Sequence, residues 1–244
     1  MNTANNGVNP EIGLGDLEKT VILNTLLEVP FGQRDEKWVD QFLSVIDQAN
    51  LKLGNPEVIV ASDGFPYIQL QNVEAEESFQ AFVISKQLPT ILLQGFGVVI
   101  NPQKERPDWV FSYGDIVNYE LNDTFYSNES SFSHSQDIVV IGKDERVLVG
   151  APSEAILPKY LKKQLREFLQ HMGIQQPKAM LIARSFENEE DLKQDLVFNF
   201  TPPQLKNDKL FEEISSAIAW MLPKHYSVLF VDEASIEGNA FIEL

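Results

Sequence analysis

The sequence predicts an α+β protein in which a mixed α/β N-terminal domain is followed by a ferredoxin-like (βαββαβ) C-terminal domain. The main observation is the order of elements from Val147 to Asp232, namely strand, helix, strand, strand, helix, strand. That order is typical of the split β-α-β motif. The length of 244 residues allows one large domain or two ordinary ones. A long Ser-, Asn- and Asp-rich segment, 122–136, predicts a surface loop near the domain boundary.

These observations predict the domain boundaries. The N-terminal domain is expected over residues 12–145 and the ferredoxin-like domain over 146–244. Residues 1–11 are polar and Asn-rich, with neither a basic region nor an apolar run, so we expect a disordered tail and no signal peptide.

Apolar periodicity and turn residues predict the elements of the N-terminal domain. One broad apolar face predicts a helix over 14–28. Asp35 is a plausible N-cap for a second, core-facing helix, which Gly54-Asn55-Pro56 would end. The elements predicted next are strands over 57–61 and 67–73, a short helix over 90–94 opened by Pro89, strands over 96–101 and 110–111, and a helix over 113–121.

The C-terminal elements follow the same signals. Strands over 138–141 and 146–150 would flank a hairpin tip at Lys143-Asp144. Pro158 and Gly173 mark the start and the stop of a helix. Strands are then predicted over 179–183, 196–200 and 227–231, with a helix between the last two that Pro223 terminates.

Charge and composition exclude several classes of function. The net charge of −17 disfavours nucleic acids and anionic membranes, because both need Lys and Arg to bind their phosphates. The acidity is explained most simply by solubility, and a basic protein partner is the alternative. With no cysteine there are no disulfides and no thiolate chemistry, which fits the cytoplasm. We therefore expect a cytoplasmic protein with a protein partner; the oligomeric state stays open.

The segment from Asp108 to Asp115 is the best candidate for a binding site. Asp108, Trp109, Tyr113 and Asp115 bring carboxylates and aromatic rings together within eight residues. Exposed aromatic side chains mark binding hot spots, whereas buried ones belong to the core. The turn and strand that carry Asp63 and Tyr67 offer a second, similar combination.

The other polar motifs predict no catalytic residue, metal or cofactor. His134, His171 and His225 share no metal-ligand spacing. Ser133-His134-Ser135 lacks the Gly-x-Ser-x-Gly elbow of hydrolases. The acidic run 187–191 lacks the central glycine and the spacing of an EF-hand loop.

Several short motifs between residues 14 and 232 are similar to those of one bacterial family. They are Leu17-Glu18-Lys19 before Pro30, Phe42-Leu43, Val98-Val99-Ile100-Asn101-Pro102 before Asp115-Ile116, Val147-Leu148-Val149-Gly150, Pro152-Ser153-Glu154 and Leu157-Pro158. In this order they resemble the SseB-type (enhanced serine sensitivity) proteins. Departures at 63–67, 107–115 and 220–226 indicate a distinct branch. The resemblance implies a bacterial cytoplasmic protein rather than an enzyme, and it assigns no catalytic residue.

Three functions remain open from the sequence. The first is a non-enzymatic interaction or regulatory protein of SseB-like type. The second is a small-ligand binder or a hydrolase-like enzyme with an interdomain site near Asp63, Asp108, Tyr113 and Asp115, where buried carboxylates would act as general acid or base. The third is an acidic immunity-type protein that neutralises a toxin through its charged face.

Overall fold

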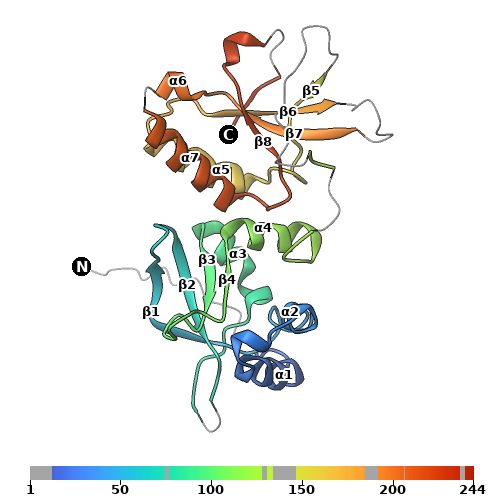
Figure 1. Cartoon of the computed structure of the whole chain (residues 1–244), viewed down its shortest axis with the longest axis vertical. Helices are drawn as coiled ribbons and strands as arrows, with labels where there is room; N and C mark the ends of the chain where they lie inside the picture. The colour runs from blue at the N-terminus through green and yellow to red at the C-terminus, as the bar shows by residue number, and fades with distance from the viewer. Residues whose placement is uncertain are drawn as a thin grey trace, which may run out of the picture. The chain divides into compact units, whose positions relative to one another are not determined.

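The computed structural model describes residues 13–74, 77–127, 131–133, 147–184, 192–205, 207–236 and 240–244 (Figure 1). Its fold is α+β, with helices and mixed β-sheets. The chain divides into two compact units between Phe111 and Ser112. Within the described ranges, no helix is both long enough and apolar enough to cross a bilayer.

The first unit is built on a four-stranded sheet of order β1-β2-β3-β4. The strands are β1 (Lys52–Val60), β2 (Pro66–Gln71), β3 (Gly97–Ile100) and β4 (Trp109–Phe111). β1 and β2 form an antiparallel hairpin, and β4 lies antiparallel to β3. β2 and β3 are parallel neighbours joined by α3 (Ile84–Gln94). The sheet is therefore mixed, and β4 is one of its edge strands.

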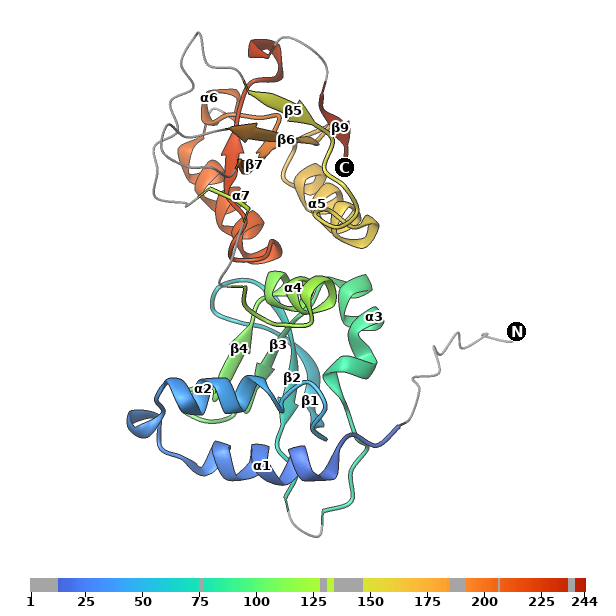
Figure 2. The same cartoon turned by 90° about the vertical axis from the view of Figure 1, so that its right-hand side faces the viewer.

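Two helices precede this sheet and pack against one another (Figure 2). α1 (Leu17–Glu28) begins where the Asp16 side chain accepts a hydrogen bond from the backbone of Lys19. A short 3-10 turn, η1 (Phe31–Gln33), leads to α2 (Glu36–Leu43). The predicted N-cap of α2 is confirmed, because the Asp35 side chain accepts from the backbone N–H of Trp38.

Two boundaries in this unit differ from the sequence prediction. Residues 54–56, predicted to end a helix, lie inside β1, where the pairing with β2 shifts register. Pro89, predicted to open a helix, lies inside α3. The helix extends past it because Ile84, Leu88 and Ile91 form a buried face on both sides of the proline. Burial of that face outweighs the local cost of the proline.

The second unit contains α4 (Tyr113–Asn122) and a second sheet. The remaining elements are β5 (Leu148–Gly150), α5 (Lys159–His171), β6 (Lys178–Arg184), β7 (Lys193–Phe198), α6 (Pro202–Leu205), α7 (Asp208–Met221), β8 (Val228–Phe230), η2 (Glu233–Ser235) and β9 (Ile242–Glu243). The helices α5 and α7 contact each other and cover one face of the sheet (Figure 1). The predicted hairpin at 138–146 lies outside the described residues.

The strand order of the second sheet corrects the ferredoxin-like prediction. The predicted succession of strands and helices is present, with the one-turn α6 added, but the order across the sheet is β5-β6-β7-β8, with β9 beside β6. In a split β-α-β motif, another strand separates the two parallel strands that a helix joins. Here β7 and β8, joined by α7, are direct parallel neighbours. Periodicity identifies the elements, but it does not specify which strands pair.

The two units share a connection pattern. In each, an antiparallel hairpin is followed by a helix and then by a strand parallel to the second hairpin strand: β1-β2-α3-β3 in the first unit and β6-β7-α7-β8 in the second. A hairpin followed by a helical crossover is a common way to bury one apolar face of a sheet under a helix. Two units can therefore share this pattern without an internal sequence repeat.

The division between Phe111 and Ser112 differs from the boundary predicted at 145/146. α4 belongs to the second unit because it contacts α7 closely. At Gly114 the backbone of α4 meets the backbone carbonyl of Leu222 so closely that a Cβ atom would collide with it. Gly114 therefore permits the close contact between α4 and the residue that follows α7, about a hundred positions away in the chain.

Candidate ligand pocket in the first unit

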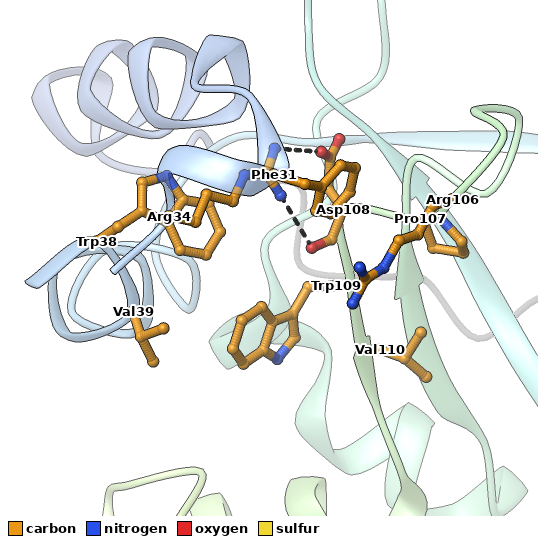
Figure 3. A pocket seen from close by; sticks show the side chains of 9 residues that line it. All are labelled: Phe31, Arg34, Trp38, Val39, Arg106, Pro107, Asp108, Trp109 and Val110. Atoms are coloured by element: carbon orange, nitrogen blue, oxygen red, sulfur yellow. Dashed lines mark hydrogen bonds and ion pairs between the residues drawn. The ribbon is translucent and has the colours of Figure 1, made fainter. Parts of the chain in front are cut away.

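A pocket of about 420 Å³ lies in the first unit where η1 and α2 meet the start of β4 (Figure 3). Its volume falls within the range of small-molecule sites. It is lined by Phe31, Arg34, Trp38, Val39, Arg106, Pro107, Asp108, Trp109 and Val110. Segments far apart in the sequence therefore build it together, and all of them belong to the same unit.

Trp38 and Trp109 line this pocket and pack against the buried ring of Phe42. Trp38 and Phe42, one helical turn apart on α2, stack with ring centroids 5.0 Å apart. Strand alternation places Trp109 and Phe111 of β4 on the same face. The Trp109 ring lies 5.9 Å from Trp38 and 5.0 Å from Phe42. The indole Nε1 of Trp38 donates to the carbonyl oxygen of Leu26 at 2.9 Å, which fixes the ring against α1.

Arg34 lines the pocket, and its guanidinium group contacts a backbone carbonyl, a carboxylate and two aromatic rings. Its Nε donates to the carbonyl oxygen of Val29 at 2.9 Å, and its Nη2 donates to Oδ1 of Asp108 at 2.6 Å. The guanidinium also lies 4.0 Å from the ring centroid of Phe31 and 4.4 Å from that of Trp38. Such cation–π contacts strengthen when they are shielded from water.

Asp108 is buried and fully paired. Its side chain is 0% exposed, and Oδ2 accepts from Lys104 Nζ at 2.6 Å and from Asn101 Nδ2 at 2.7 Å. Burial by itself would raise the pKa of this carboxyl. The hydrogen bonds from Lys104, Arg34 and Asn101 outweigh that effect and hold the pKa below its usual value. Asp108 is therefore ionised at neutral pH and has a structural role. It is poorly suited to general acid–base catalysis, because its pKa lies far below neutral pH and both of its oxygens are already paired.

The structure brings only two of the six candidate residues, Asp108 and Trp109, to this pocket. Asp63 and Tyr67 pair with each other at the β1–β2 hairpin, where the tyrosine hydroxyl donates to Oδ2 of Asp63 at 2.7 Å. Asp63 Oδ1 also accepts from the backbone N–H of Phe65, which is the pattern of an Asx-turn. Tyr67 is 3% exposed, so this pair stabilises the hairpin.

Tyr113 and Asp115 lie at the start of α4 in the second unit. Tyr113 is buried against Trp220, and burial raises its pKa well above the usual range. Asp115 forms a capping box with Ser112 and an ion pair with Lys224 at 3.1 Å. Burial raises the pKa of Asp115 despite the Lys224 ammonium, and its Oδ1 accepts no hydrogen bond from any residue that the structure describes. Both residues have structural partners within their own unit.

Seven of the nine lining residues were not predicted as site residues, and the ones that matter most are Phe31, Arg34, Trp38 and Arg106. In the sequence, Phe31 follows a helix break and Trp38 belongs to an apolar stripe, which predicts only a turn and a core position. The available signal was the short separation of Arg34 and Trp38, four residues apart, which lets the two side chains meet in a cation–π contact although Arg34 precedes the N-cap of α2. Nothing in the sequence places either residue beside Asp108.

A second pocket, of about 310 Å³, lies in the second unit between α7 and the edge strand β8. Its lining is mostly apolar, and its one charged member, Lys224, is already paired with Asp115. This pocket lacks the array of rings and guanidinium groups that distinguishes the first.

The remaining polar motifs form no metal site in the part of the chain that the structure describes. There, no group of three or more histidine and acidic side chains is placed to hold an ion. His171 is exposed on α5, and burial lowers the pKa of His225 beside Phe132 and Tyr226. Ser133 is buried, whereas His134, Ser135 and the acidic run 187–191 lie outside the described residues.

Comparison with known proteins yields no significant match to a protein-family model, a curated protein or a solved structure. The geometry of the pocket therefore carries the functional argument.

Proposed function

We propose that this chain is a non-enzymatic regulatory or interaction protein, of SseB-like type and cytoplasmic, whose binding site is the aromatic pocket of the first unit. One observation carries the proposal: the rings of Phe31, Trp38 and Trp109 line a cavity of about 420 Å³. Aromatic side chains around a concave site are typical of ligand pockets and of binding hot spots.

The alternative of a carboxylate-dependent enzyme has less support. Its candidate acids, Asp63, Asp108 and Asp115, each stabilise a local structure: a hairpin turn, a buried ion pair and a helix cap. A general acid or base needs a carboxyl group that faces substrate and can exchange its proton. Asp108 is the one carboxylate that lines the pocket, and both of its oxygens are engaged.

A matched pair of valine substitutions tests the proposal. Val110 lines the pocket and Val149 does not; each is the middle residue of a three-residue edge strand, with exposed fractions of 44% and 42%. Val110→Glu adds a carboxylate to the lining of the pocket, and Val149→Glu adds the same charge in the second unit. The full chain and both variants would be used to capture small molecules and proteins from a bacterial extract, which mass spectrometry would identify.

We expect Val110→Glu to lose at least one specifically bound species that the wild type and Val149→Glu retain. Circular dichroism would establish that both variants are folded. Identical captured species for all three chains would contradict the proposed binding site.

A further inference from the structure

The charge of the pocket is opposite to that of the protein. The whole chain has a net charge of −17, yet the charged side chains that line the pocket are Arg34, Arg106 and Asp108. Asp108 neutralises Arg34 at 2.6 Å in a nearly buried pair. Lys104, just outside the lining, adds a second cation to the same carboxylate. The balance of the lining residues is therefore positive.

Arg106 supplies this uncompensated charge. It is exposed, and among the described residues no carboxylate, including neighbouring Glu105, lies within ion-pairing distance of it. Its guanidinium lies 4.8 Å from the ring centroid of Phe31. Figure 3 shows it turned toward the space between Phe31 and Trp109. A cation–π contact orients the group while leaving its N–H donors available.

An arginine in this position is suited to one kind of chemical group. Guanidinium matches a carboxylate through two parallel hydrogen bonds, and these charge-assisted bonds are about twice as strong as neutral ones. The half-buried Trp109 offers apolar ring surface beside it, and Phe31, although its ring lies against both guanidinium groups, is still 37% exposed. A ligand ring packed against this exposed aromatic surface would place an attached carboxylate near Arg106.

We infer that the pocket binds a small molecule that combines a planar apolar ring with a carboxylate, the ring lying against Phe31 and Trp109 and the carboxylate pairing with Arg106. This inference rests on the proposed function and names the ligand class of the same site. Its volume of about 420 Å³ admits a molecule of one or two fused rings. The net charge of −17 disfavours non-specific binding of such an anion elsewhere on the chain.

Two matched probes test the ligand class: 2-naphthoate and its neutral amide, 2-naphthamide. They share the ring and differ in charge. Both would be titrated into the full chain while NMR follows the indole N–H signals of Trp38, Trp109 and Trp220. Trp220 belongs to the second unit, outside this pocket, and serves as an internal reference. The Arg106→Gln, Arg106→Lys and Glu105→Gln variants would be titrated in the same way.

We expect naphthoate to shift the Trp109 signal and to bind about tenfold more tightly than naphthamide, a difference of about 1.4 kcal/mol. Arg106→Gln should abolish that preference, Arg106→Lys should restore part of it, and Glu105→Gln should retain it. Equal affinity for the two probes would overturn the ligand class while supporting a ring-binding pocket. Failure of both probes to shift Trp109 would also overturn the ligand class, and the Val110→Glu capture would then decide the proposed function separately.

Discussion

Arg34 and Asp108 are 74 residues apart in the chain, and the Nη2 of one lies 2.6 Å from the Oδ1 of the other. Their side chains are only 8% and 0% exposed. The pair joins the segment before α2 to the start of β4, so it closes the pocket at its inner side. Breaking a buried ion pair of this kind leaves an uncompensated buried charge.

We therefore predict that Asp108→Asn destabilises the protein by about 3 kcal/mol, because Arg34 and Lys104 lose their counterion. Urea denaturation followed by tryptophan fluorescence would measure the loss. Glu105→Gln removes an exposed carboxylate three residues away and should change the free energy of unfolding by less than about 0.5 kcal/mol. Equal effects of the two substitutions would contradict the structural role of the pair.

The same pair predicts a pH dependence. The folded-state pKa of Asp108 is lowered from its ordinary value of 3.8, so the unfolded chain binds the proton more readily. The stabilisation from the ionised carboxylate is thus fully present above the unfolded pKa and is lost as the pH falls through the folded pKa. The stability difference between wild type and Asp108→Asn should be constant near neutrality and should shrink below about pH 4. A difference that grows with acidification would be inconsistent with this assignment.

Gly114→Ala should be strongly destabilising. Alanine normally stabilises a helix relative to glycine by about 1 kcal/mol. Here the added methyl group would collide with the backbone carbonyl of Leu222, and the α4–α7 contact would have to open. We expect a net loss of about 3 kcal/mol in thermal or urea unfolding. Gly150→Ala is the control, because its methyl group would meet no atom within 4 Å. A stabilised Gly114→Ala variant would refute this close packing.

Ser227 stabilises a buried carboxylate in the second sheet. Its hydroxyl donates to Oδ1 of Asp195 at 2.6 Å, and Oδ2 of that carboxylate pairs with Arg184 at the same distance. Ser227→Ala should cost about 2 kcal/mol, since a buried charged acceptor loses its donor. Ser235→Ala removes an exposed hydrogen bond of the same length and should cost less than about 1 kcal/mol. Differential scanning calorimetry would compare the stability of the two variants. Equal losses of stability would contradict the prediction that the buried hydrogen bond contributes more than the exposed one.

Local sequence signals predicted many of the elements because local chemistry determines them. Asp35 caps α2, and Ser112 with Asp115 begins α4. The apolar spacing of Leu161, Leu165 and Leu169 predicts the buried face of α5, and all three are fully buried. The prediction that Pro89 begins a helix is wrong, because the apolar face of α3 extends across this residue. The free energy gained by burying that face exceeds the cost of a proline inside the helix.

The candidate site was harder to predict than the elements. The aromatic residues and carboxylates from Asp108 to Asp115 predict one site, but the fold separates them: Trp109 lines the pocket, whereas Tyr113 lies beside Trp220 in the second unit. The sequence does not show that Arg34 pairs with Asp108 or that Arg106 lies against Phe31, because another segment supplies the partner in each case.

By itself, the sequence determined the α+β class, the succession of most helices and strands and the excess of negative charge, because caps, periodicity and titratable groups act over a few residues. Only the tertiary structure decided which strands are neighbours, to which unit α4 belongs and where a positive aromatic pocket forms in an acidic protein. These features depend on strand register, on backbone contact at Gly114 and on the burial of Asp108 between two cations. Each of them is a long-range interaction whose energy exists only once the chain has folded.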